Sequence, residues 1–125
     1  MARLRRAIIG AGTLAFVGIA ASGCGNSGAI SDAQSACRQV SKSIALYASI
    51  TPSTPADQAA QIASMAQSEL LAALPHAAAA TSADGTYNAL MTTIGEASRV
   101  PENLLIPALK AQCRVVMSTS PFLAQ

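Results

Sequence analysis

The sequence predicts an all-α fold, an antiparallel up-and-down bundle of about four short helices. Two observations predict it. After residue 30, apolar residues recur at the three- and four-residue spacing of helices in four segments, and almost none of this region alternates with the two-residue period of a strand. Short connections rich in Pro, Gly, Ser and Thr separate the segments, and short connections favour antiparallel neighbours.

The first helix is expected to begin at Ser31, because Ser31 and Gln34 match an S-x-x-Q capping box. It is expected to end near Ile50, since the run TPSTP at residues 51–55 cannot continue a helix. Its apolar stripe consists of Ala33, Cys37, Val40, Ile44 and Tyr47.

The second helix is expected to use Thr54 as its N-cap and Pro55 as its first residue, both favoured choices at those positions. Pro75 either kinks or ends this helix, and residues 77–80 add a further turn if it is only kinked. Its apolar stripe consists of Ala59, Ile62, Ala66, Leu70 and Ala73 or Leu74.

The third and fourth helices complete the predicted bundle. The third follows a turn and cap cluster at residues 81–85 and extends to Ser98. The fourth spans about residues 101–118, with Glu102 near its start, where the helix dipole favours an acidic residue, and Pro107 as a candidate break. The apolar face of the third is Tyr87, Leu90, Met91 and Ile94, and that of the fourth is Leu105, Leu109, Cys113 and Val116 or Met117.

The composition excludes two classes of protein. Of the 125 residues, 11% are charged, less than half the roughly 25% of an average globular protein, so neither a disordered polyelectrolyte nor a nucleic-acid-binding protein is expected. Three arginines near the start, Arg3, Arg5 and Arg6, account for the net charge of +2. From Cys24 onward, five Lys and Arg stand against six Asp and Glu, a balance of −1.

The first 23 residues are expected to form a cleaved signal peptide. A basic start, MARLRR, precedes an uncharged apolar stretch and then small residues, which is the pattern of a secretory signal. The stretch is shorter than the about 20 residues of a spanning helix, which argues against an uncleaved anchor. The predicted organisation is a signal peptide at residues 1–23, a flexible tether at 24–30 and a helical domain at 31–125.

The sequence Ala21-Ser22-Gly23-Cys24 resembles the lipobox of bacterial lipoproteins, in which small residues precede an obligatory Cys. The resemblance implies cleavage between Gly23 and Cys24, a diacylglyceryl thioether on the Cys24 sulfur, and a further acyl chain such as palmitate on the new amino group. A lipobox more often has Leu at the position of Ala21. The alternative is an ordinary secretory signal and a soluble secreted protein.

Cys37 and Cys113 are expected to form a disulfide. With Cys24 carrying lipid, they are the remaining pair in an exported, oxidising setting. Both lie on apolar stripes, and they fall at one level of the bundle if the first and last helices are antiparallel neighbours. The bridge closes a loop of roughly 77 residues, which stabilises the fold by about 4 to 5 kcal/mol. The alternative is two buried free thiols.

The sequence predicts no enzyme, no cofactor and no metal site. His76 is the only histidine, and one His without a Cys pair does not form a typical zinc site. The helical region contains no G-x-S-x-G, S-x-x-K, P-loop or C-x-x-C motif. His76 is expected to be an ordinary surface or satisfied residue, and Tyr47 and Tyr87 are expected to pack in the core; the alternative is that these three residues bind a ligand.

Two further groups of apolar residues could either pack in the core or form a binding site. Met65, Met91 and Met117 are expected in the core, and the alternative is that they line an adaptable apolar cavity. The run Leu104-Leu105-Ile106 is likewise expected to pack inside, and the alternative is an exposed binding patch.

As a whole the chain is similar to the small, Ala-rich lipoproteins of high-GC Gram-positive bacteria. The lipobox and the lack of catalytic groups lead us to expect a non-catalytic structural or interaction module on the outer face of the cell membrane, held there by membrane lipid through acylated Cys24, with an envelope protein as its candidate partner. The alternative is a carrier that binds a hydrophobic small molecule within the bundle. Haemophore-like proteins of the same bacteria also join first and last helices by a disulfide, which makes haem the specific form of that alternative.

Overall fold

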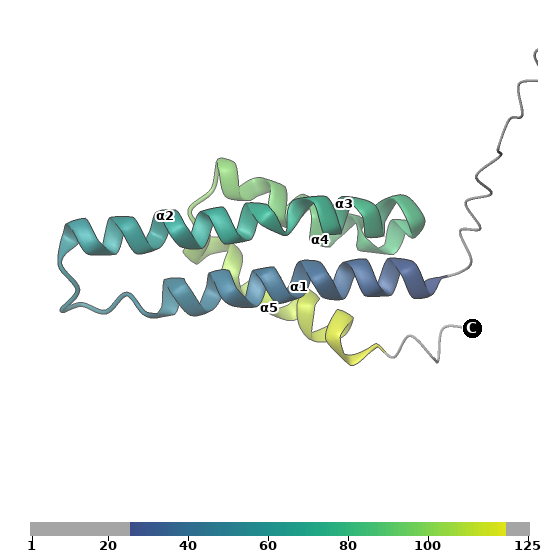
Figure 1. Cartoon of the computed structure of the whole chain (residues 1–125), viewed down its shortest axis with the longest axis horizontal. Helices are drawn as coiled ribbons and strands as arrows, with labels where there is room; N and C mark the ends of the chain where they lie inside the picture. Colours follow the sequence, from purple (N-terminus) through teal and green to yellow (C-terminus); the bar gives the residue numbers. More distant parts are fainter. Residues whose placement is uncertain (1–25, 120–125) are drawn as a thin grey trace, which may run out of the picture.

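The computed structural model describes residues 26–119, and within this range all regular structure is helical (Figure 1). The range holds five α-helices and two short 3-10 helices, the latter labelled η. They are α1 (Asn26–Ala48), α2 (Ala56–Ala72), α3 (Leu74–Ala83), η1 (Gly85–Tyr87), α4 (Asn88–Gly95), η2 (Glu96–Ser98) and α5 (Glu102–Ser118). The predicted all-α class is confirmed.

The helices pack side by side, and the chain reverses direction between the successive rods (Figure 1). α2 and α3 follow each other as one bent rod that lies antiparallel beside α1, α4 returns along α3, and α5 crosses α1 obliquely on its far side in this view. α1 packs against α2, α3 and α5, which makes it the central helix of the bundle.

α1 begins at Asn26, five residues before the predicted start. Ala29 and Ile30 are already buried in this first part of the helix. The predicted flexible tether at residues 24–30 is therefore wrong for residues 26–30, while Cys24 and Gly25 lie outside the described residues.

The predicted capping box at Ser31 and Gln34 does not form, because both residues lie inside α1. The Ser31 carbonyl accepts a hydrogen bond from the Ser35 hydroxyl at 3.0 Å, a contact within the helix. The Gln34 side-chain amide donates instead to the carbonyl oxygens of Val116 and Thr119 at the end of α5, at 3.5 and 3.0 Å. Gln34, which the sequence pattern assigned to a helix cap, therefore joins α1 to the end of α5 instead.

α2 begins one residue later than predicted. Pro55 is its N-cap, with extended backbone angles, and the Pro55 carbonyl accepts the first helical hydrogen bond from the Ala59 N–H at 2.8 Å. The Thr54 hydroxyl makes no cap; it accepts from the Thr51 N–H within the preceding loop at 2.9 Å.

The bend between α2 and α3 coincides with Pro75, which is the second residue of α3 and has no N–H to donate. Ala73 between the two helices keeps helical backbone angles, so the chain bends without leaving the helical path. Ala77 and Ala80 of α3 are buried, and the helix extends to Ala83. Of the two outcomes expected at Pro75, an end of the helix or a kink followed by a further turn, the structure shows the kink with a further helical stretch beyond it.

The remaining predicted elements need one correction. Asp84 caps η1, and hydrogen bonds from the hydroxyl and backbone N–H of Thr86 lower the pKa of the Asp84 carboxyl. Glu96 and Arg99, three residues apart, form an ion pair on the surface. α5 is one continuous helix with Pro107 inside it, so the predicted break at Pro107 is wrong.

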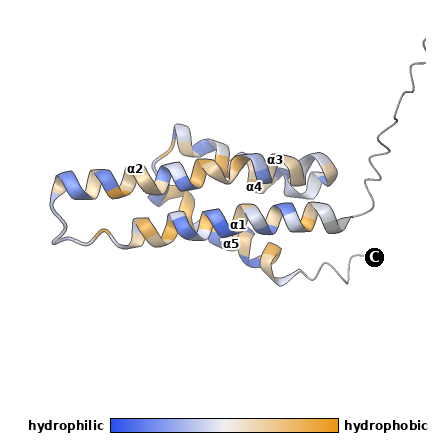
Figure 2. Ribbon diagram, viewed as in Figure 1, coloured by the Kyte–Doolittle hydropathy of each residue, from blue (hydrophilic) through white to orange (hydrophobic). Residues whose placement is uncertain are grey.

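The core lies where the apolar faces of these helices meet, and Figure 2 shows apolar and polar residues alternating along the ribbons. Most of the predicted stripe residues are buried, and Met117 is exposed. The half-buried ones are Ile44, Tyr47, Ala59, Ile62, Leu74, Tyr87 and Met91. The largest fully buried side chains are Leu70, Ile94, Leu109, Val40, Cys37 and Ser43. Many core positions hold alanine, so the helices approach closely around few large side chains.

Cys37 and Cys113 form the predicted disulfide, with their Cα atoms 5.4 Å apart. Cys37 lies in the middle of α1 and Cys113 in the last third of α5. The bridge therefore joins the first and last helices of the bundle, as expected from their antiparallel arrangement. The alternative of two free thiols is excluded for this structure.

Candidate functional site

Gly23 and Cys24, the residues of the predicted cleavage and lipidation, lie outside the described residues. Among residues 26–119, none of the helices has the length and apolar character needed to cross a membrane. Within the same range, no three His, Cys, Asp or Glu side chains come together in a way that could hold a metal ion.

The structure does not bring Tyr47, His76 and Tyr87 together as one ligand site. Tyr47 at the end of α1 and Tyr87 at the start of α4 line two different pockets that have no residue in common. His76 is exposed in the first turn of α3 and lines neither pocket. Any ligand held by these residues would contact one tyrosine alone.

The three methionines do not share one environment, and neither do the apolar residues at positions 104–106. Met65 and Met117 are exposed and Met91 is half-buried against the core, so the expectation of three core methionines is wrong for the first two, and no single methionine-lined cavity forms among them. In the run Leu104-Leu105-Ile106, Leu105 is buried and Ile106 is half-buried, whereas Leu104 is exposed, so the expectation that the run packs inside is wrong for Leu104.

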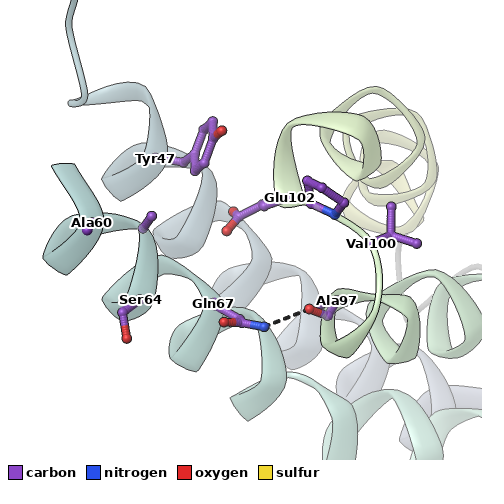
Figure 3. A pocket seen from close by; sticks show the side chains of 9 residues that line it. Tyr47, Ala60, Ser64, Gln67, Ala97, Val100 and Glu102 are labelled. Carbon is purple, nitrogen blue, oxygen red and sulfur yellow. Dashed lines mark hydrogen bonds between the residues drawn. The ribbon is translucent and has the colours of Figure 1, made fainter. Parts of the chain in front are cut away.

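The larger of the two pockets has a volume of about 450 Å³ and lies between the end of α1, the middle of α2 and the start of α5. We call it the Glu102 pocket. Its lining residues come from all three helices and from η2 and the segment after it: Tyr47, Ala60, Ala63, Ser64, Gln67, Ala97, Val100, Pro101 and Glu102. Figure 3 shows the Glu102 carboxyl group pointing from the start of α5 into the space between Tyr47 and Gln67.

The walls of the Glu102 pocket are mostly apolar. Ala60 and Ala63 on α2 present only methyl groups, which leaves room beside the ring of Tyr47. On the opposite side the Gln67 side-chain amide donates to the Ala97 carbonyl at 2.8 Å, which ties α2 to η2 and fixes that wall (Figure 3). The size and lining are typical of a small-molecule site.

Glu102 is only 8% exposed, although it is an acidic residue. Its Oε1 atom lies 2.6 Å from the Ser43 hydroxyl oxygen, and Ser43 is itself completely buried on α1. Its Oε2 atom is buried and has no hydrogen-bond partner. Burial raises the pKa of Glu102, and the hydrogen bond from Ser43 opposes that rise only in part.

The Ser43 hydroxyl lies equally close to two acceptors, Glu102 Oε1 and the Ala66 carbonyl oxygen of α2, both at 2.6 Å. A serine hydroxyl carries one hydrogen and can donate to only one of them. With Glu102 ionised, Ser43 donates to Oε1. With Glu102 protonated on Oε1, Ser43 accepts that proton's hydrogen bond and donates to Ala66. In both states Oε2 is an acceptor without a donor.

The second pocket, which we call the Tyr87 pocket, lies between α4 and α5 and has a volume of about 380 Å³. Its lining residues are Thr86, Tyr87, Ala89, Leu90, Gln112, Val115, Val116 and Thr119. Gln112 donates to the Thr93 hydroxyl at 3.0 Å, and its own Oε1 atom is buried without a partner. Burial and the nearby charge of Asp84 raise the pKa of Tyr87, so its phenol stays neutral at physiological pH.

Ser43, Gln67 and the burial of Glu102 were not anticipated from the sequence, although a signal was present. Glu102 lies three residues before Leu105, in register with the apolar stripe of α5, and Ser43 lies three residues after Val40 on the stripe of α1. A polar residue at a stripe position indicates a buried polar group. Which two such residues meet depends on how α5 crosses α1, and helical periodicity does not specify that crossing.

Comparison of the chain with models of protein families, with curated proteins and with solved structures finds no match.

Proposed function

We propose that this chain is an exported lipoprotein, held by lipid on Cys24 at the outer face of the cell membrane, where its helical body acts as a non-catalytic structural or interaction module. The disulfide between Cys37 and Cys113 is the observation that carries the proposal. Disulfides persist in exported proteins and are rare in the reducing cytosol. The basic, apolar and small-residue order of residues 1–24 supports export by a lipoprotein signal.

The anchor can be tested at Cys24. We expect the mature wild-type chain, isolated from bacteria that process lipoproteins, to have the mass of residues 24–125 plus acyl groups, and to incorporate a labelled fatty acid. The Cys24→Ser variant is expected to carry no label. A double Cys37→Ala and Cys113→Ala variant is the matched control, because it loses two cysteines and keeps the acceptor. Equal labelling of Cys24→Ser and wild type would reject the anchor.

A second candidate function is that of a carrier for a hydrophobic small molecule. The Tyr87 pocket favours it, since it combines apolar walls from Leu90 and Val116 with two polar groups, Tyr87 and Gln112. If the bound molecule were haem, Tyr87 would be its only tyrosine ligand in this pocket.

Native mass spectrometry of the protein from its own host tests the carrier hypothesis. We expect a bound molecule that is lost when Leu90→Trp fills the Tyr87 pocket and kept when Leu71, outside both pockets, becomes Trp. A mass that never exceeds the chain and its acyl groups would reject the carrier. For haem, a Soret band that Tyr87→Phe leaves unchanged would reject the tyrosine as ligand.

A further inference from the structure

We propose that the Glu102 pocket is a binding site for a small organic cation, a primary ammonium group carried on an apolar body. The ammonium group donates a hydrogen bond to the Glu102 carboxylate, and the apolar body occupies the space between Tyr47 and the alanines of α2. This site does not depend on the lipid anchor, because every residue that forms it lies within residues 26–119.

The first step is the unsatisfied acceptor. A buried polar atom without a partner costs free energy, and a buried carboxylate costs more than a neutral group. Oε2 of Glu102 lacks a donor whichever way the Ser43 proton points. Because Glu102 lines the pocket, a donor that enters the pocket can supply this missing hydrogen bond while the helices stay in place.

The second step is the sign of the ligand's charge. Glu102 forms no ion pair in the described part of the chain, where the ion pair found is that of Glu96 with Arg99. No Lys or Arg lines the Glu102 pocket, and Tyr47 is the only other titratable side chain that does. A ligand with a positive charge therefore supplies what the pocket lacks, while an anionic ligand would face an uncompensated carboxylate.

The third step is shape. An about 450 Å³ pocket accepts a small molecule. The Tyr47 ring forms one wall, and a cation beside an aromatic face gains a further attraction. Oε2 is covered by its neighbours in this conformation. Because the terminal torsion of a glutamate is broad, rotation about the Cγ–Cδ bond can turn this oxygen toward the pocket when a ligand enters.

Benzylammonium is a suitable probe, since it combines a primary ammonium group with an aromatic body. We expect it to shift the resonances of Glu102 and Tyr47 saturably in NMR titrations of the full chain. Glu102→Gln is expected to weaken this binding by about tenfold or more, the loss of one charge-assisted hydrogen bond. Glu96→Gln removes the same charge outside the pocket and is expected to leave the affinity within about twofold of wild type.

Two further measurements keep the test decisive even if Glu102→Gln does not fold. Benzyltrimethylammonium keeps the charge and the ring but has no N–H, so it is expected to bind the wild type about tenfold or more weakly than benzylammonium. Affinity for benzylammonium is expected to rise with pH as Glu102 ionises. Equal affinity of both cations, an unchanged affinity in folded Glu102→Gln, or no saturation in the millimolar range would overturn the proposal. None of these outcomes bears on lipidation of Cys24.

Discussion

Glu102 is the residue whose chemistry departs furthest from its expected role. An acidic side chain in the first turn of a helix normally faces solvent and is stabilised as the anion by the helix dipole. Here the side chain is turned inward against Ser43, and burial outweighs the hydrogen bond from Ser43, so that the pKa of Glu102 lies above its usual range. The position of one proton also sets the hydrogen-bond pattern of Ser43, which alternates between α5 and the Ala66 carbonyl of α2.

This arrangement predicts an unusual dependence of stability on pH. In the unfolded chain Glu102 loses its proton near the ordinary value of 4.5, whereas the folded chain keeps it to higher pH. Between these two values the folded state binds more protons than the unfolded state, so the free energy of unfolding falls as pH rises. The contribution is complete below the ordinary pKa and is lost once the pH exceeds the folded pKa.

We therefore expect Glu102→Gln to remove this decline and to be more stable than wild type at neutral pH, because Gln keeps an acceptor for Ser43 and carries no charge. Urea unfolding followed by circular dichroism over a pH series measures the effect. Glu96→Gln, at the exposed ion pair, is the control and is expected to shift the curve by less than about 1 kcal/mol without changing its slope. A fall in stability with pH that is as steep in Glu102→Gln as in wild type would contradict the assignment.

At the scale of the helices, apolar periodicity predicted the four helical segments and most of their buried faces, because burial of one face is what stabilises each helix. Pro75 marked the bend between α2 and α3, although the sequence left open whether the helix would end there. Periodicity and local capping patterns did not place the ends of the helices correctly. The start of α1 was placed at Ser31 by a local capping pattern, yet Ala29 and Ile30 are buried, and Gln34 is drawn to the end of α5. Local sequence signals do not contain such contacts between distant segments.

The stripe of α2 allows a matched test of this periodicity. Leu70 is completely buried, whereas its neighbour Leu71 is 36% exposed. We expect Leu70→Ala to destabilise the fold by about 2 to 5 kcal/mol, since it removes a large side chain from a core that contains few. Leu71→Ala should cost about 1 kcal/mol or less. Urea unfolding measures both, and equal losses would show that α2 does not pack as described.

At the scale of the whole molecule, the disulfide compensates for a thin core. Alanine occupies many of the buried positions, so each helix contributes little apolar area to the bundle. Cys37 and Cys113 are 76 positions apart in the sequence, and their bond joins α1 to α5 at the crossing that also brings Ser43 to Glu102. The same bridge therefore supports both the fold and the Glu102 pocket.

Removal of the bridge is expected to destabilise the protein strongly. A loop of this length predicts a loss of about 4 to 5 kcal/mol, because the unfolded chain regains the conformational freedom that the bond had removed. The double Cys37→Ala and Cys113→Ala variant tests this by urea unfolding, and reductant should lower the stability of the wild type by a similar amount while leaving the double variant unchanged. Alkylation of both wild-type thiols without reduction, or equal stability of the two proteins, would show that the bridge is absent or contributes nothing.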